Sequence, residues 1–271
     1  MRKIIVRTII GLLVVVLAIV LLVSFFPSQF SWMIGWIPMP VATPSPPVID
    51  TPKGALPSGP VGLEQWWEVG SSGYNLHETS GFLLKLDGGE VIGVTTAHSL
   101  YSPVPNPDVK RVGLGVNGQD TPIAESDTYY GRPGVPHTGI DLTVDYVLLK
   151  LNSVDDSYAL TPDLRGAPEP GESVFIFSGL GDQKGGPLRW EGTVLSGDSY
   201  GVRLLMDKSF VFPGGMSGSP VISQHTGQVV GMVIAGGLWS GHWIIGVHPI
   251  GHLVQLAEDA HDFPKMEGYQ R

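Results

Sequence analysis

The chain has 271 residues, of which 42% are hydrophobic, 37 are glycine, 23 are proline and none is cysteine. This length can bury one large hydrophobic core or two small ones, and the lack of cysteine excludes disulfides and thiolate metal ligands. The many short apolar runs between turn residues favour an all-β fold.

A long apolar run lies near the N-terminus. From residue 9 to residue 26 only Ser24 is polar, and at about 1.5 Å per residue a helix of this length approaches the thickness of a hydrocarbon core. Residues 1–8 hold three basic side chains, so the positive-inside bias places them in the cytoplasm and the later part of the chain outside. We expect a transmembrane helix over 9–26 that stays in the cell membrane, with Trp32 and Trp36 at its interface; a cleaved signal peptide is the alternative.

An interfacial segment and a proline-rich linker follow, over residues 27–60. Eight prolines between residues 38 and 60 leave few backbone donors for a sheet, so we expect a semi-stiff polyproline II spacer. The chain beyond residue 26 carries 13 basic and 25 acidic residues, a net charge of −12. This balance argues against nucleic acid and anionic lipid as partners.

From about residue 61 the chain alternates short apolar segments with Gly, Pro, Asn and Asp. The segments SGFLLKL (80–86) and EVIGVTTA (90–97) are joined by DGG, which is typical of a hairpin. Eight further apolar runs begin near Val109, Asp145, Glu172, Leu188, Val202, Gly218, Val229 and His242. We therefore expect at least ten strands. Only PIGHLVQLAEDA has helical spacing, and one face of that helix would carry Ile250, Leu253, Val254 and Ala257.

Three polar residues stand next to these predicted strands. His98 follows a strand in TTAHSL, Asp145 heads another in VDYVLLKL, and Ser217 lies in GGMSGSP. A serine hydroxyl is a poor nucleophile unless a base takes its proton, and that base needs a third group to fix its tautomer. Glycines around Ser217 indicate a backbone that needs positive φ or a close approach. Asp141 is a second candidate for the acid, but it lies further from its strand.

The order of these segments resembles that of the chymotrypsin-fold serine proteases. TAH after a strand, an acid leading YVLLKL, then PGGMSGSPVIS and VVGMVIAG look most like the cysteine-free bacterial HtrA-like branch. The resemblance covers roughly residues 78–258. It implies an all-β protease domain over 61–265 with two six-stranded antiparallel β-barrels, an active site in the cleft between them and a short C-terminal helix, followed by a tail over 266–271.

The resemblance also implies roles for individual residues. His98 would be the general base and later the general acid, Asp145 its orienting partner and Ser217 the nucleophile. The backbone N–H groups of Gly215 and Ser217 would form the oxyanion hole. The implied activity is endopeptidase hydrolysis of peptide or protein substrates through an acyl-enzyme, in a membrane-anchored domain outside the cytoplasm.

The implied substrate pocket departs from that of trypsin. Val211 stands where an aspartate selects lysine or arginine, and Ala235 and Gly236 would line one wall, with Phe210 or Phe212 narrowing the pocket. We therefore expect cleavage after uncharged, mostly apolar residues, because a buried cation facing valine would lose its hydration without gaining a partner.

Two further departures concern activation and support of the acid. Met216 stands where many relatives have the aspartate that pairs with a freed N-terminus, so activation by that ion pair is excluded. Ile234 replaces a serine that in many relatives hydrogen-bonds the catalytic aspartate. Asp145 is therefore expected to lack one partner.

Two further points concern metal binding and an alternative function. We expect no cofactor and no metal site, because His248 precedes the predicted helix whereas His252 lies inside it. The alternative function is a weak or inactive protease-fold module that binds extended peptides by strand addition. The presence of His98, Asp145 and Ser217 together favours the active enzyme.

Overall fold

The computed structural model describes residues 41–70, 74–101, 108–180, 189–208, 210 and 214–270, with 74–78 as backbone only. The cytoplasmic N-terminus and the transmembrane helix predicted over 9–26 lie outside these residues. In the described part of the chain, no helix is long and apolar enough to cross a membrane. Residues 43–237 and 243–271 form one compact unit.

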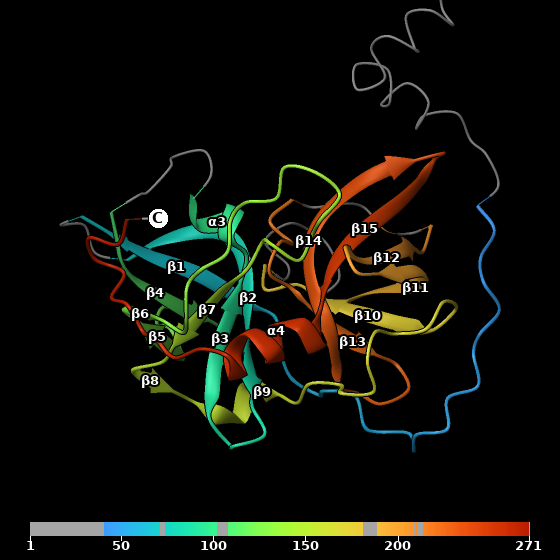
Figure 1. Cartoon of the computed structure of the whole chain (residues 1–271), viewed down its shortest axis with the longest axis horizontal. Helices are drawn as coiled ribbons and strands as arrows, with labels where there is room; N and C mark the ends of the chain where they lie inside the picture. Colours follow the sequence, from blue (N-terminus) through green and yellow to red (C-terminus); the bar gives the residue numbers. More distant parts are fainter. Residues whose placement is uncertain are drawn as a thin grey trace, which may run out of the picture. The chain divides into compact units, whose positions relative to one another are not determined.

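The C-terminal half of this unit is a closed barrel of antiparallel strands in the order β10-β11-β12-β15-β14-β13 (Figure 1). Its strands are β10 (Ser173–Phe177), β11 (Arg189–Asp198), β12 (Gly201–Met206), β13 (Pro220–Ser223), β14 (Val229–Trp239) and β15 (His242–Pro249). Alternate side chains point inward and form an apolar core that includes Val174, Ile176, Val194 and Leu204. The predicted six-stranded barrel is confirmed for this half.

The N-terminal half is a nine-stranded sheet in the order β6-β7-β3-β2-β1-β4-β5-β8, with β9 paired to β2. Its strands are β1 (Leu63–Val69), β2 (Tyr74–Lys85), β3 (Val91–Thr95), β4 (Val109–Gly115), β5 (Ala124–Ser126), β6 (Thr128–Tyr129), β7 (Val147–Lys150), β8 (Ser153–Val154) and β9 (Ala159–Leu160). The second six-stranded barrel that the sequence predicted is confirmed only in part, as a sheet in which residues 124–129 pair with β4 through β5 and with β7 through β6.

The break between β5 and β6 lies at Asp127. Strands β5 and β6 lie towards opposite ends of the strand order, yet Asp127 alone separates them in the chain. The carbonyl of Asp127 accepts a hydrogen bond from the backbone N–H of Met266 at 2.9 Å, and its carboxylate lies 2.8 Å from Nζ of Lys265. The C-terminal tail thus pairs with the chain at the break between β5 and β6.

Two helices flank the sheets. Helix α3 (Ala97–Tyr101) follows β3 and was not predicted from the sequence. Helix α4 (Ile250–Glu258) buries the face that the sequence predicted, namely Ile250, Leu253, Val254 and Ala257. That face belongs to a core shared with Phe82 of β2 and Ile222 of β13. Helix α4 therefore joins the two halves of the unit.

Two points of the proline-rich segment, at Ser45 and Gly54, contact the C-terminal barrel and the turn before it. The backbone N–H of Gly54 donates to the carbonyl of His225 at 2.9 Å. A Cβ on Gly171 would lie 2.0 Å from the carbonyl oxygen of Ser45, so these two segments of the chain approach too closely for a side chain at residue 171. The sequence predicted a semi-stiff spacer here and gave no sign of these contacts.

Candidate active site

His98 and Asp145 are brought together by the pairing of β3 with β7. The register places Thr95 opposite Val147, so α3 and the residues just before β7 lie at the same edge. Nδ1 of His98 lies 2.7 Å from Oδ2 of Asp145, and the backbone N–H of His98 donates to Oδ1 at 3.0 Å. The imidazole is therefore held at two points by one carboxylate.

A third donor to Asp145 comes from an unexpected residue. The backbone N–H of His137 donates to Oδ2 of Asp145 at 3.1 Å. The loop before it runs beside the chain that carries Asp145, with the N–H of Gly134 bonded to the carbonyl of Tyr146 at 2.9 Å. A Cβ on Gly134 would lie 2.1 Å from the carbonyl oxygen of Val144. Glycine is thus required for this close approach.

This donor corrects one expectation from the sequence. Ile234 was expected to leave Asp145 short of a partner, because isoleucine cannot donate a hydrogen bond. The amide of His137 supplies that hydrogen bond instead. The sequence carries no signal for it, since a backbone donor does not depend on residue type.

The carboxylate of Asp145 is fully buried. Burial raises its pKa, but the hydrogen bond and the charge of His98, with the amides of His98 and His137, outweigh burial and hold the pKa below its ordinary value. An ionised acceptor on Nδ1 favours the tautomer of His98 that leaves Nε2 free. Asp141 instead accepts hydrogen bonds from the N–H and hydroxyl of Thr143 at 2.9 and 2.6 Å, so it is occupied in its own turn.

The loop around Ser217 depends on glycine. Gly214, Gly215 and Gly218 have φ of 71°, 67° and 89°, a region that other residues rarely adopt. A Cβ on Gly218 would also lie 1.9 Å from the carbonyl oxygen of Ser80. The interpretation that these glycines serve a positive-φ turn is confirmed. In this loop, Oγ of Ser217 donates to the carbonyl of Ile234 at 3.1 Å.

Ser80 of β2 ties the loop of Ser217 to the N-terminal sheet. Its N–H donates to the carbonyl of Ser217 at 3.0 Å, and its hydroxyl donates to the carbonyl of Gly215 at 3.1 Å. The same hydroxyl accepts from the N–H of Gly179 at 3.2 Å, and its carbonyl accepts from Oγ1 of Thr95, just before α3, at 2.9 Å. Sequence reasoning missed Ser80; the only signal was a small polar residue within strand β2, ahead of its hydrophobic run.

Two backbone amides of this loop are available for a ligand. No described residue accepts a hydrogen bond from the N–H of Gly215 or from that of Ser217. Between them, Met216 is fully buried in the core of the C-terminal barrel. Apolar packing of Met216 therefore holds the loop at this position. In many chymotrypsin-fold serine proteases, the family that the sequence resembles, an ion pair acts there.

The residues expected around the substrate pocket divide into three groups. Val211 and Phe212 lie outside the described residues. Ala235 is half-buried and Gly236 is exposed, both on β14 directly after Ile234. Phe210 is buried, with its ring 5.6 Å from that of Trp190. It therefore belongs to the barrel core.

A buried histidine, His248, lies behind Asp145 and contacts the exposed His252. Nε2 of His248, on β15, lies 3.0 Å from Nδ1 of His252, on α4, and the ring of Tyr146 contacts that of His248 edge-on at 5.9 Å. Burial lowers the pKa of His248 to about 3, with a further contribution from His252. The sequence placed these histidines on the strand side and the helix side correctly but did not predict their contact.

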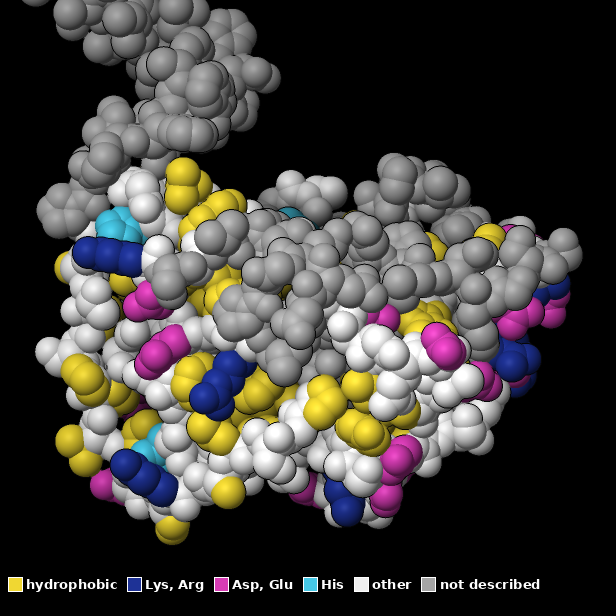
Figure 2. Space-filling view, turned by 180° about the vertical axis from the view of Figure 1, so that it is seen from behind, with side chains coloured by type: hydrophobic (Ala, Val, Ile, Leu, Met, Phe, Trp, Pro, Cys, Tyr) yellow, Lys and Arg dark blue, Asp and Glu magenta, His cyan; other side chains and the backbone are white. Residues whose placement is uncertain are grey.

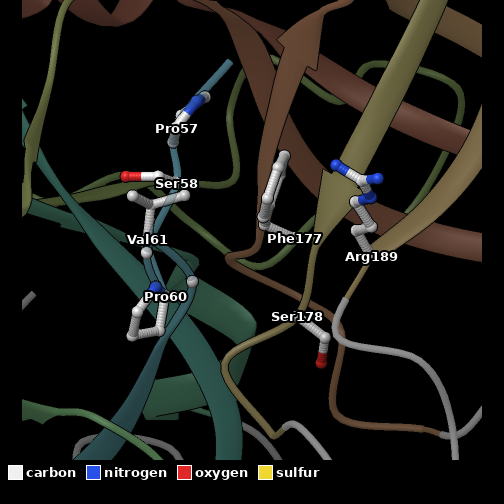
Figure 3. Close-up of a pocket in the computed structure, with 9 residues that line it drawn as sticks. Pro57, Ser58, Pro60, Val61, Phe177, Ser178 and Arg189 are labelled. Atoms are coloured by element: carbon white, nitrogen blue, oxygen red, sulfur yellow. The ribbon is translucent and has the colours of Figure 1, made fainter.

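Among pockets lined by described residues, one of about 450 Å³ lies between residues 57–62 and the end of β10 (Figure 3). Pro57, Pro60 and Val61 face Phe177 and Arg189 across it. None of the candidate catalytic residues lines this pocket, so it is distinct from the candidate active site.

Charged side chains are interspersed on the face seen in Figure 2. Lys and Arg lie singly among acidic and apolar groups on that face. The described residues visible there therefore present no continuous basic surface.

The comparison with known families decides the class of this chain. The trypsin-like peptidase domain family matches residues 79–232, more than half of the chain. The chain belongs to this family. The matched segment of this trypsin-like peptidase contains His98, Asp145 and Ser217. No curated protein sequence matches the chain.

Solved structures share the fold of this trypsin-like peptidase at low sequence identity. A mutant of human heparin binding protein is 14% identical, over 78% of this chain and 95% of that chain, with a TM-score of 0.51. A Glu endopeptidase in complex with MPD is 17% identical, over 78% and 98%, with a TM-score of 0.48. The thermostable serine protease AL20 from an extremophilic microorganism is 13% identical, over 74% and 97%, with a TM-score of 0.48. The chain thus has a chymotrypsin-like all-β fold.

Proposed function

We propose that this trypsin-like peptidase is a membrane-anchored serine endopeptidase whose catalytic domain lies outside the cytoplasm. Family membership supports peptide-bond hydrolysis. The observation that carries the residue assignment is the 2.7 Å contact between Nδ1 of His98 and the buried carboxylate of Asp145. The anchor rests on the apolar run over 9–26 and the basic residues before it.

In the proposed reaction, Oγ of Ser217 attacks the scissile carbonyl while Nε2 of His98 takes its proton. The tetrahedral intermediate collapses to an acyl-enzyme, and His98 gives the proton to the leaving amine. Water then attacks the ester with His98 again as base, which releases the acid and regenerates Ser217. The negative charge of Asp145 stabilises the imidazolium formed in each step.

The free amides of Gly215 and Ser217 would bind the developing oxyanion. Donors that are already oriented in the folded state are worth about 3 kcal/mol each in the transition state. The positive φ of Gly214 and Gly215 and the hydrogen bond from Ser80 to the carbonyl of Gly215 support this role, because they fix the orientation of the loop before substrate arrives.

The hydroxyl of Ser217 must turn for this chemistry. It donates to the carbonyl of Ile234 at 3.1 Å, and rotation about χ1 would exchange that acceptor for Nε2 of His98. Catalytic hydrogen bonds often tighten only when substrate binds. The same hydrogen bond is the observation that favours the second candidate function, an inactive module that binds extended peptides along β14.

Activation by cleavage of the N-terminus is not required in this proposal. The position of the activating aspartate is occupied by Met216, whose side chain is packed in the barrel core. The loop is therefore ordered by burial of an apolar side chain, which folding alone provides.

The proposed specificity is cleavage after uncharged, mostly apolar residues. It rests on Val211 at the expected base of the pocket and on the small side chains of Ala235 and Gly236 at its wall. Digesting an unfolded protein mixture with the full-length chain and sequencing the new ends tests this. We expect cuts after apolar residues that a Ser217→Ala control does not make. A majority of cuts after Lys or Arg would refute the pocket, and no cuts above the control would favour the peptide-binding module.

A further inference from the structure

The ring of His137 lies beside the ring of His98. Their centroids are 5.9 Å apart and the planes meet at 81°. His98, His137 and Asp145 each offer one possible metal-ligating atom, and these atoms all lie within 4.8 Å of one another. We propose that His98 and His137 together bind a borderline transition-metal cation of the Zn²⁺ class, and that this cation reversibly blocks the active site. The blocking rests on the proposed function, whereas the binding does not.

Asp145 has the role of an orienting carboxylate in this site. It is fully buried, and its oxygens accept hydrogen bonds from Nδ1 and N–H of His98 and from N–H of His137. A carboxylate bonded to one imidazole nitrogen while the other faces the metal is the usual arrangement around protein-bound zinc. Nε2 of His98 is therefore the ligand, already held in place.

His137 supplies the second ligand. Its Nδ1 is buried and has no hydrogen-bond partner among the described residues. A buried imidazole nitrogen without a partner is unfavourable, and a metal ion between the two rings would satisfy it. Since the chain has no cysteine, neutral imidazoles are the ligands in this chain that suit Zn²⁺ best.

The hydrogen bond from the N–H of His137 to Asp145 fixes the backbone from which the ring projects. It anchors the backbone at 3.1 Å from the same carboxylate that orients His98, so one group holds the ring of His98 and the backbone of His137. Two protein ligands leave two positions of a tetrahedral ion for water. Binding by two imidazoles is thus weak enough to be reversible, in contrast to a closed structural site.

Metal binding and catalysis compete for one lone pair. Nε2 of His98 must accept the proton of Ser217 in the proposed reaction, and it cannot do so while it ligates a cation. The site therefore acts as an inhibitory switch. It also departs from the expectation of no metal site, which considered only the histidines near the C-terminus.

Calorimetric titration with zinc chloride tests the binding. It uses the full-length chain, freed of metal by a chelator, in a Ser217→Ala background that makes the result independent of hydrolysis. We expect His137→Ala and His137→Gln each to weaken the affinity at least about tenfold, because both remove the ligand while the backbone hydrogen bond to Asp145 can remain. His252→Ala and His261→Ala, which change histidines outside the site, should leave the affinity unchanged. Melting curves establish that each variant is folded.

The chain with Ser217 intact tests the inhibition. Zinc should slow peptide hydrolysis at the concentration at which it binds, and EDTA should restore the rate. Unchanged affinity in both His137 variants, or loss of binding only in His252→Ala, would overturn the site. Binding that leaves hydrolysis unaffected at saturation would overturn the inhibition. Binding that needs His137 in a chain without any hydrolytic activity would support the site and refute the proposed function.

Discussion

The backbone N–H of His137 donates to the oxygen of Asp145 that also lies 2.7 Å from Nδ1 of His98. One carboxylate oxygen therefore connects the loop of residues 134–137 to the imidazole. The geometry of His98 depends on this loop as well as on α3.

Gly134→Ala should displace this loop and slow catalysis. The added methyl would lie 2.1 Å from the carbonyl oxygen of Val144, so the loop must shift and the amide of His137 moves from Asp145. A misplacement of about 1 Å costs on the order of 10²-fold, and we expect a fall of that size in kcat. Gly139→Ala is the matched control, because a Cβ there meets nothing within 4 Å. Equal kcat in the two variants would contradict the role of the loop.

Ser80→Ala should destabilise the fold and lower kcat. It removes the hydroxyl that links the amide of Gly179 to the carbonyl of Gly215, and an unsatisfied buried group costs about 1 to 3 kcal/mol. Ser219→Ala changes another buried serine, whose hydroxyl has no partner among the described residues. Urea unfolding and peptide hydrolysis should therefore separate the two variants. Comparable losses in both would mean that Ser80 acts only by filling space.

The free energy of unfolding should decrease as the pH is lowered, because of His248. Burial lowers the pKa of His248 to about 3 in the folded chain, against about 6.5 in the unfolded chain. Below about pH 6.5 the unfolded chain takes up a proton that the folded chain does not, so the free energy of unfolding decreases by up to about 1.4 kcal/mol per pH unit. Asp145 and Asp163, with pKa values below 3.8, contribute stability above that value and lose it only in stronger acid.

Urea unfolding of wild type and His248→Gln between about pH 7.5 and pH 4.5 measures this effect. The variant should show a flatter dependence on pH, whatever its stability at neutral pH. His261→Gln, at an exposed histidine, should follow the wild type. Parallel curves for wild type and His248→Gln would show that His248 takes up its proton in the folded state too.

Arg165→Met should destabilise the connection between the two halves. The guanidinium donates to the buried carboxylates of Asp163 at 2.7 Å and Glu172 at 2.9 Å, which would be left without their cation. Removing one partner of a buried ion pair costs about 3 to 5 kcal/mol. Arg132→Met, at an exposed arginine, should stay within about 0.5 kcal/mol of the wild type. A loss below about 1 kcal/mol in Arg165→Met would show that water replaces the guanidinium.

The sequence predicts the parts of this fold that depend on local pattern. The ten expected strands and the buried face of α4 follow from alternation and from the spacing of Ile250, Leu253, Val254 and Ala257. Helix α3 was missed because five residues carry too little periodicity. The contact of Asp127 with Lys265 was missed because the two residues are far apart in the chain.

The residues of the candidate site also divide into those that local sequence pattern predicts and those that depend on contacts it does not show. His98, Asp145 and Ser217 were proposed from their flanking residues, and the structure brings the first two into contact. Ser80 and His137 were not identified, because Ser80 acts through contacts distant in sequence and His137 contacts Asp145 through its backbone. Such contributions leave no mark on residue type.

Fluorophosphonate labelling of the full-length chain, mapped by mass spectrometry, tests most directly whether Ser217 is a nucleophile activated by His98 and Asp145. We predict a single labelled peptide, the one that contains Ser217. Labelling should slow by about 10⁴-fold in Asp145→Asn, because the wrong tautomer of His98 is then favoured, and should be unchanged in Asp141→Asn. A folded chain without label on Ser217, or equal labelling of Asp145→Asn and wild type, would contradict the proposed activity.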